Sequence, residues 1–116
     1  MTCDLRRLAV VGCLLGAIAI PLVAQNSAWM QPFPGHRVIG NLYAVGAYDL
    51  AVFLITSDDG HILINTGLED STPLIRENIQ SLGFQLEDVQ ILLQMQSHWD
   101  HTAALAEIKQ ITGAAM

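Results

Sequence analysis

Apolar residues gather in short runs through the first half of this chain and later recur at helical spacing, an order that predicts strands before helices. Val38–Val45 is predicted as a strand interrupted at Gly40-Asn41, and Leu50–Thr56 and His61–Asn65 as two further strands. The segment Ser57–Gly60 between the last two contains Asp-Gly, which is typical of a hairpin turn because both residues tolerate positive φ. Strands that are apolar on both faces belong in the interior of a layered fold.

The later part of the chain predicts helix, strand and helix in turn. Thr72 can cap a helix and Pro73 suits its first turn, apolar residues follow at helical spacing, and Gly83 suits the end of that helix. Residues Val89–Met95 alternate in the manner of a strand, and Thr102–Ile111 carries one apolar stripe, as an amphipathic helix does. The order β-β-β-α-β-α over 116 residues predicts one α/β domain at most.

Residues 1–24 have the pattern of a secretory signal peptide. Arg6-Arg7 gives a positive start, the apolar run Leu8–Ile20 follows, and a small residue precedes the expected cleavage point. A single membrane anchor is the alternative, but the run is shorter than the roughly 20 residues that span a bilayer, and Pro21 ends it. We therefore expect export to the periplasm or the outside, and no stable membrane anchor after processing leaves residues 25–116.

Removing this leader changes the charge and the cysteine content. The whole chain has a formal net charge of −6, and without the leader it keeps ten acidic side chains against three basic ones, a net charge of about −7. No basic patch remains to bind phosphates, so nucleic acid and anionic membrane surfaces are poor candidate partners. Cys3 and Cys13 both lie in the leader, so the remaining chain has neither a disulfide nor a thiolate metal site.

The segment Gln96–His101 carries the candidate chemistry, at the predicted junction between a strand and a helix. Gln96 and His98 lie two residues apart in an extended segment, so they point the same way and can reach one metal ion. Asp100 and His101 follow where the chain turns into the helix, so they project elsewhere and can serve a second ion. Because imidazole nitrogen and carboxylate oxygen are ordinary zinc ligands, we predict all four side chains as metal ligands.

Each of these residues also has an ordinary structural interpretation. Asp100 alone would serve as a helix N-cap, either histidine alone as a polar residue at the edge of the core, and Gln96 as a strand-end amide. Their combination at one junction favours a metal site because zinc geometry is demanding. Elsewhere, we interpret His61 as a surface residue that follows a turn, and Trp99 as a packing residue or the wall of a pocket.

These residues give the chain a resemblance to the metallo-β-lactamase superfamily, whose signature at such a junction is His-x-His-x-Asp-His. His98, Asp100 and His101 match three of its four positions, and Gln96 stands at the first. The chain is most similar to the third subclass of class B β-lactamases, and Gln96 resembles that subclass's glutamine-bearing branch. Asn65 stands where many members carry an Asp that supports the metal site from behind. The segments that carry the closer similarity are Trp29–Pro32, Gly46–Leu50 and Ile62–Gly67, within a match from about Trp29 to Gly113.

The resemblance implies an αββα sandwich built from two halves, of which residues 25–116 would form the first. It implies one or two zinc ions, a β-lactam antibiotic as the small-molecule substrate, and a role in antibiotic resistance. Water activated by zinc would attack the lactam carbonyl without a covalent enzyme intermediate. Asp100 would be the catalytic residue, because it would bind the second ion, orient the nucleophile and help to move its proton. Since further ligands would come from later segments, we expect the chain alone to be inactive.

Other functions remain open at this point. The same scaffold could serve a lactonase or a thioesterase, because a fold does not fix a function. The chain could also be a non-enzymatic remnant or a small exported zinc-binding protein. A serine hydrolase lacks support because no Gly-x-Ser-x-Gly motif occurs. Since a neutral amide oxygen binds zinc less well than imidazole does, we expect the Gln96/His98 ion to bind more weakly than the Asp100/His101 ion.

Overall fold

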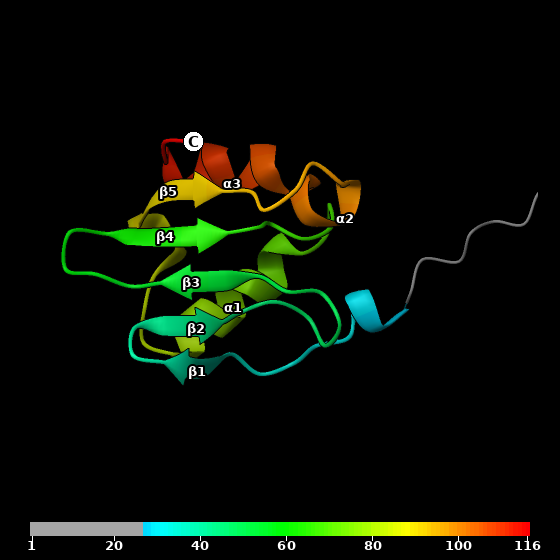
Figure 1. Cartoon of the computed structure of the whole chain (residues 1–116), viewed down its shortest axis with the longest axis horizontal. Coiled ribbons are helices and arrows are strands. Elements are labelled where there is room, and N and C mark those ends of the chain that lie inside the picture. The colour runs from blue at the N-terminus through cyan, green and yellow to red at the C-terminus, as the bar shows by residue number, and fades with distance from the viewer. Residues whose placement is uncertain (1–26) are drawn as a thin grey trace, which may run out of the picture.

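The computed structural model describes residues 27–116, which form one mixed five-stranded sheet with its two longer helices on one face (Figure 1). This arrangement confirms the predicted α/β class. The strands are β1 (His36–Ile39), β2 (Leu42–Ala44), β3 (Phe53–Ile55), β4 (His61–Ile64) and β5 (Val89–Leu93). The helices are α1 (Thr72–Ser81), α2 (Trp99–Thr102) and α3 (Leu105–Thr112), with short 3-10 helices η1 (Ser27–Trp29) and η2 (Leu86–Asp88).

The sheet follows sequence order, β1-β2-β3-β4-β5. Neighbouring strands from β1 to β4 are antiparallel, and β5 lies parallel to β4 after the chain crosses over through α1. The predicted hairpin between β3 and β4 is confirmed, with Ile55 opposite Ile62 and Gly60 at φ 115°. Only a residue without a side chain adopts that φ readily, so glycine suits this turn.

The predicted strand Val38–Val45 is wrong as a single element. Gly40-Asn41 is a turn that folds the segment into the antiparallel pair β1 and β2, with Ile39 opposite Leu42 and Gly40 at φ 54°. An interruption by two turn-forming residues thus reverses the chain instead of merely bending it.

Both predicted helices form, with altered boundaries. The N-cap of α1 is Ser71, not Thr72, and the Ser71 hydroxyl oxygen accepts a hydrogen bond from the backbone N–H of Leu68. The predicted helix Thr102–Ile111 begins earlier, at Trp99, and is divided into α2 and α3. The two pieces separate at Ala103, whose N–H donates to the carbonyl of Trp99 at 3.0 Å and also to that of Gly67 at 3.1 Å.

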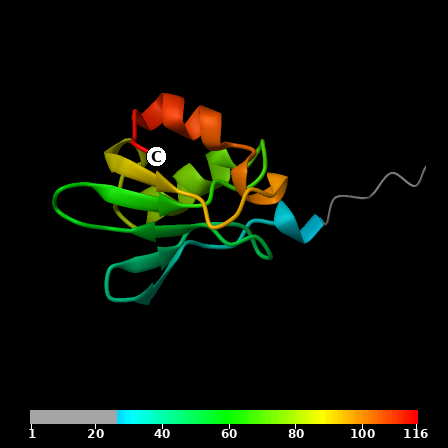
Figure 2. The same cartoon turned by 45° about the horizontal axis from the view of Figure 1, so that its top comes forward.

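The core lies between the sheet and the helices. Leu54 and Leu63 from the sheet are fully buried against Ile75 and Ile79 of α1 and Ile108 of α3. Figure 2 shows both helices on the same side of the sheet. The opposite face of the sheet is also apolar, but within residues 27–116 no element covers it, and Ile91 and Leu93 remain 39% and 45% exposed. The other members of this face are Leu42, Ala44, Phe53, Ile55, Ile62 and Ile64.

The interpretation of His61 as a surface residue is wrong, because its side chain is buried at 8% exposure. His61 begins β4 on the face that carries the core, and its ring meets the Phe84 ring edge-on at 5.3 Å between centroids. Its Nδ1 lies 3.4 Å from the backbone nitrogen of Ser57. The preceding turn therefore tucks the imidazole inward.

The predicted signal peptide, residues 1–24, lies outside the described residues. Between residues 27 and 116, no helix has the length and apolar character needed to cross a membrane.

Candidate metal centre

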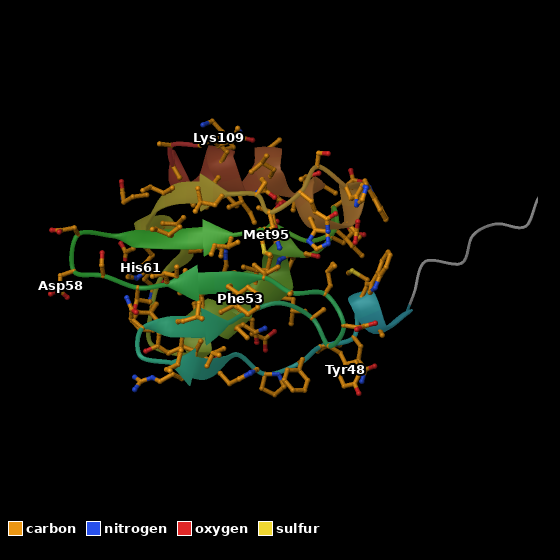
Figure 3. All side chains as sticks on the ribbon, in the orientation of Figure 1. Tyr48, Phe53, Asp58, His61, Met95 and Lys109 are labelled. Atoms are coloured by element: carbon orange, nitrogen blue, oxygen red, sulfur yellow. The ribbon has the colours of Figure 1, made fainter. Side chains whose placement is uncertain are left out.

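The predicted ligand segment begins just past β5, which ends at Leu93, two residues before the predicted strand end. An extended stretch leads to His98, whose φ and ψ are −65° and 145°, and α2 then starts at Trp99. In Figure 3, Met95 lies at the end of the sheet away from His61 and Asp58. The strand-to-helix junction that the sequence predicted for Gln96–His101 is therefore present.

Asp100 and His101 lie side by side on α2. The Oδ2 atom of Asp100 is 3.2 Å from Nε2 of His101, and the two side chains are 23% and 17% exposed. The other ring nitrogen of His101, Nδ1, is buried and has no hydrogen-bond partner in the described part of the chain. A carboxylate oxygen and an imidazole nitrogen are donors that fit zinc. The Nδ1 atom of His101 could bind a metal without giving up a hydrogen bond within residues 27–116.

Gln96 and His98 are both exposed. Residues 27–116 contain no group of three or more His, Cys, Asp or Glu side chains placed to hold a metal ion. The structure thus brings Asp100 and His101 together. The assignment of Gln96, His98, Asp100 and His101 as ligands stays a prediction.

The alternative interpretation of Asp100 as a helix N-cap is wrong. His98 holds the N-cap position of α2, without a side-chain capping bond, and Asp100 lies in the first turn. Trp99 is 54% exposed, so it does not pack in the core of the described region. Asp100 is therefore not committed to the helix end, which leaves its carboxylate to its contact with His101.

A support for the ligand segment comes from Asn65, Thr66 and Gly67, directly after β4. Thr66 donates two hydrogen bonds to the carbonyl of His101, from its backbone nitrogen at 2.9 Å and from Oγ1 at 3.2 Å. The Asn65 Oδ1 atom accepts a hydrogen bond from the backbone N–H of Met95 at 3.1 Å. Sequence reasoning placed Asn65 behind the metal site only through the family resemblance, and it missed Thr66.

Two residues in or beside the ligand segment bury polar side-chain atoms that lack hydrogen-bond partners within residues 27–116. These are His101, through Nδ1, and Gln94, through both amide atoms. Buried polar groups are nearly always paired in folded proteins. Their concentration at this junction marks it as the part of the described structure whose polar groups are least satisfied.

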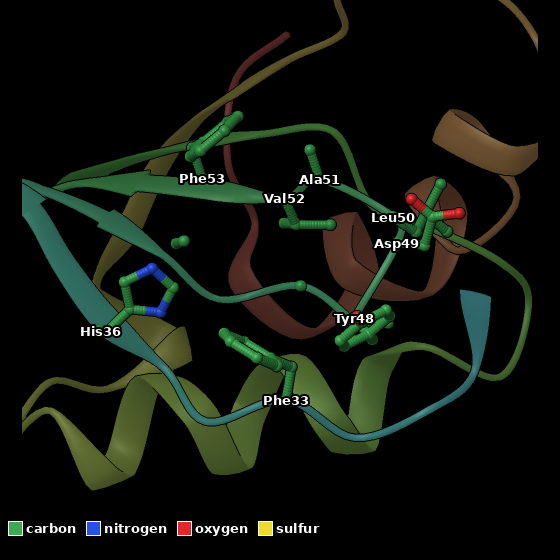
Figure 4. Close-up of a pocket in the computed structure, with 11 residues that line it drawn as sticks. Phe33, His36, Tyr48, Asp49, Leu50, Ala51, Val52 and Phe53 are labelled. Atoms are coloured by element: carbon green, nitrogen blue, oxygen red, sulfur yellow. The ribbon is translucent and has the colours of Figure 1, made fainter. Parts of the chain in front are cut away.

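A separate cavity of about 300 Å³ lies beside the loop that joins β2 to β3 (Figure 4). Phe33, Tyr48 and Phe53 supply aromatic lining, and His36 and Asp49 supply polar groups. None of the four predicted metal ligands lines this cavity.

Comparison with known proteins supplies the family. The model of the metallo-beta-lactamase superfamily matches residues 45–115, and the chain belongs to that superfamily. The crystal structure of the metallo-beta-lactamase GOB-18 from Elizabethkingia meningoseptica is 51% identical, with a TM-score of 0.77 over 78% of this chain and 33% of that chain. The predicted family and fold are thus confirmed.

Other solved structures point to one subclass. The class B3 di-zinc metallo-beta-lactamase LRA-12 from an Alaskan soil metagenome is 52% identical, with a TM-score of 0.76 over 78% of this chain and 34% of that one. BJP-1 of Bradyrhizobium japonicum, a subclass B3 metallo-beta-lactamase, is 41% identical, with a TM-score of 0.73 over 75% and 33%. The predicted similarity to the third subclass is confirmed. The chain spans about a third of the length of each of these structures.

Proposed function

We propose that residues 25–116 form the first part of a zinc-dependent hydrolase that opens the β-lactam ring. The observation that carries this proposal is the Asp100–His101 pair at the strand-to-helix junction. Hydrogen bonds from Thr66 to the carbonyl of His101 anchor the backbone of this pair. Membership of the superfamily and similarity to structures named as metallo-beta-lactamases support it. Similarity to a structure described as a di-zinc enzyme supports zinc as the metal.

In this proposal the four predicted ligands have distinct tasks. Asp100 and His101 would hold one zinc ion, and Gln96 and His98 would contribute to holding another. Bound zinc would supply Lewis acidity, which makes water ionise near neutral pH and stabilises developing negative charge. The Asp100 carboxylate would orient the attacking water and take its proton. The water oxygen would add to the lactam carbonyl carbon, the ring C–N bond would break, and the nitrogen would gain a proton.

We infer that the 116-residue chain is inactive on its own. A catalytic zinc site needs three protein ligands with one open position, and no described cluster offers three. Its sheet also leaves one apolar face uncovered within residues 27–116. Hydrolysis of a chromogenic cephalosporin should be absent for the purified 116-residue chain and present for the complete gene product. Zinc-dependent hydrolysis by the short chain would contradict this inference.

The substrate class is tested by comparing lactams, lactones and thioesters with the complete gene product. Preference for a lactam, abolished by a chelator and restored by zinc, would support the proposal. Preference for a lactone or thioester would replace it with another hydrolase on the same fold. Full activity in the presence of a chelator would refute zinc chemistry altogether.

We further propose that residues 1–24 direct export to the periplasm or the outside. The charged start, the apolar run and the small residue at position 24 support this proposal. N-terminal sequencing of the protein recovered from a periplasmic extract should begin at Gln25. Recovery of an uncleaved chain in the cytoplasmic fraction would refute it.

A further inference from the structure

Asn65 adopts an unusual backbone conformation where β4 ends. It is the only non-glycine residue with a positive φ among residues 27–116, at 65°, and the residue is only 1% exposed. Its own N–H still donates to the carbonyl of Leu93 at 2.8 Å, which continues the pairing of β4 with β5. The left-handed conformation then turns the chain away from the sheet. Asn tolerates this conformation better than most residues.

The side chain of Asn65 joins two segments that are distant in sequence. Its Oδ1 accepts from Met95 N–H at 3.1 Å, and its Nδ2 donates to the carbonyl of Ala51 at 3.2 Å. A backbone N–H can only donate and a carbonyl can only accept, so these partners fix which way the amide faces. A carboxylate has no donor to offer Ala51. Both bonds together therefore require an amide.

The two segments lie at the same end of the sheet. Met95 directly precedes Gln96 and the other predicted zinc ligands, and Ala51 ends the loop 46–51 between β2 and β3 (Figure 1). That loop is closed by a hydrogen bond from Ala47 N–H to the carbonyl of Leu50 at 3.1 Å. It carries Tyr48, which is 60% exposed and lines the cavity of Figure 4.

We propose that Asn65 is a positioning residue that couples the loop 46–51 to the zinc-ligand segment. Zinc binding fixes the segment after Met95, and the Asn65 amide carries that restraint to Ala51. The loop and its Tyr48 side chain are then ordered when metal is bound. Because coupling between two sites is reciprocal, an ordered loop also favours metal binding. This inference rests on the proposed zinc site.

Amide hydrogen exchange in the complete gene product tests the coupling. Saturating zinc should slow exchange at Ala47 N–H at least about tenfold in the unaltered protein, since exchange reports local opening. Asn65→Asp keeps the acceptor for Met95 but loses the donor to Ala51, so this zinc-dependent protection should disappear. Asn41→Asp is the matched control. Asn41 lies in the β1–β2 turn, and its Nδ2 also donates to a backbone carbonyl, that of Thr56. Its protection should match that of the unaltered protein.

Three results would overturn the inference or separate it from the proposed function. Equal zinc-dependent protection in Asn65→Asp and the unaltered protein would refute the coupling, as would its absence in the unaltered protein with zinc bound. If Asn65→Asp does not fold, Asn65→Gly takes its place, because glycine accepts the positive φ while it removes both side-chain bonds. Failure of the unaltered protein to bind zinc would refute the proposed function itself, and the coupling with it.

Discussion

The carbonyl of His101 receives two hydrogen bonds from Thr66, one from the backbone nitrogen at 2.9 Å and one from Oγ1 at 3.2 Å. Thr66 is fully buried, and 35 residues separate it from His101. Thr66, two residues past the end of β4, therefore fixes the backbone of His101, a predicted zinc ligand that follows β5. These two bonds restrain the backbone from which the His101 side chain projects.

Replacing Thr66 with valine in the complete gene product should weaken zinc binding about tenfold, the lower end of what lost outer contacts cost. The variant keeps the side-chain shape and loses only the hydroxyl. Thr66→Ser keeps the hydroxyl and loses a buried methyl, so both variants should lose about 1 kcal/mol of stability. Competition with a chromophoric chelator should show weakened zinc binding for valine alone. Equal zinc affinity in the two variants would mean that the hydroxyl has no role in positioning.

Gln96 should make the two predicted metal positions unequal. A neutral amide oxygen is a poorer zinc ligand than imidazole, so the Asp100/His101 position should fill first in a titration of the complete gene product. Gln96→His should strengthen the weaker step and leave the stronger one unchanged. Titration with Co²⁺, followed by its absorption spectrum, distinguishes the steps. First occupation of the Gln96/His98 position would contradict the expectation.

The uncovered sheet face should make the 116-residue chain associate. Exposed apolar patches of this kind are an aggregation hazard. Leu93→Lys, on the uncovered face, should reduce self-association and binding of a hydrophobic dye without changing the circular dichroism spectrum. Leu92→Lys is the matched control, because Leu92 is 2% exposed and faces the helices, so it should unfold the chain. Unchanged association of Leu93→Lys in light scattering would show that this face is not responsible.

Glu87 should give a small stabilisation that depends on pH. Its hydrogen bond from Arg76 lowers the pKa of the carboxyl below the ordinary value of 4.5. The folded chain therefore keeps the charge to a lower pH than the unfolded chain, so the stabilisation is complete above about pH 4.5 and is lost as the pH falls below it. Because both side chains are substantially exposed, the effect should stay under about 1 kcal/mol.

Glu87→Gln should accordingly lower the free energy of unfolding at neutral pH, and the difference from the unaltered chain should vanish in acid. Urea denaturation at several pH values measures it. Glu77→Gln, which removes a charge from the exposed side of α1, serves as the control. A difference for Glu87→Gln that persists unchanged in acid would rule out the ion pair as its origin.

Hydrophobic periodicity predicted the strands and helices well where local signals were strong. The hairpin at Gly60 and the end of α1 at Gly83 follow from glycine with positive φ. The break between α2 and α3 could not be predicted, because Ala103 and Ala104 favour helix. At the break, the Ala103 N–H donates to the carbonyl of Gly67, in a distant part of the chain, as well as to that of Trp99.

The same distinction applies to the candidate site. The sequence predicted the junction at Gln96–His101, because both the ligand types and the change of period are local. The role of Thr66 was missed, because a threonine between Asn65 and Gly67 has the composition of an ordinary turn. His61 was misplaced for a related reason: the direction of a side chain after a turn is set by the packing partner, here Phe84.

The parallel pairing of β4 with β5 has a consequence for the order in which the chain folds. The strands β1 to β4 are joined by short local connections, whereas β5 arrives only after α1 has crossed the sheet. Closing long loops is slow compared with forming hairpins. Pulse-labelled amides of β3 should therefore become protected before that of Asn65, whose N–H donates to the carbonyl of Leu93 just past β4. The predicted zinc ligands, which follow β5, would then be among the last residues to reach their native positions.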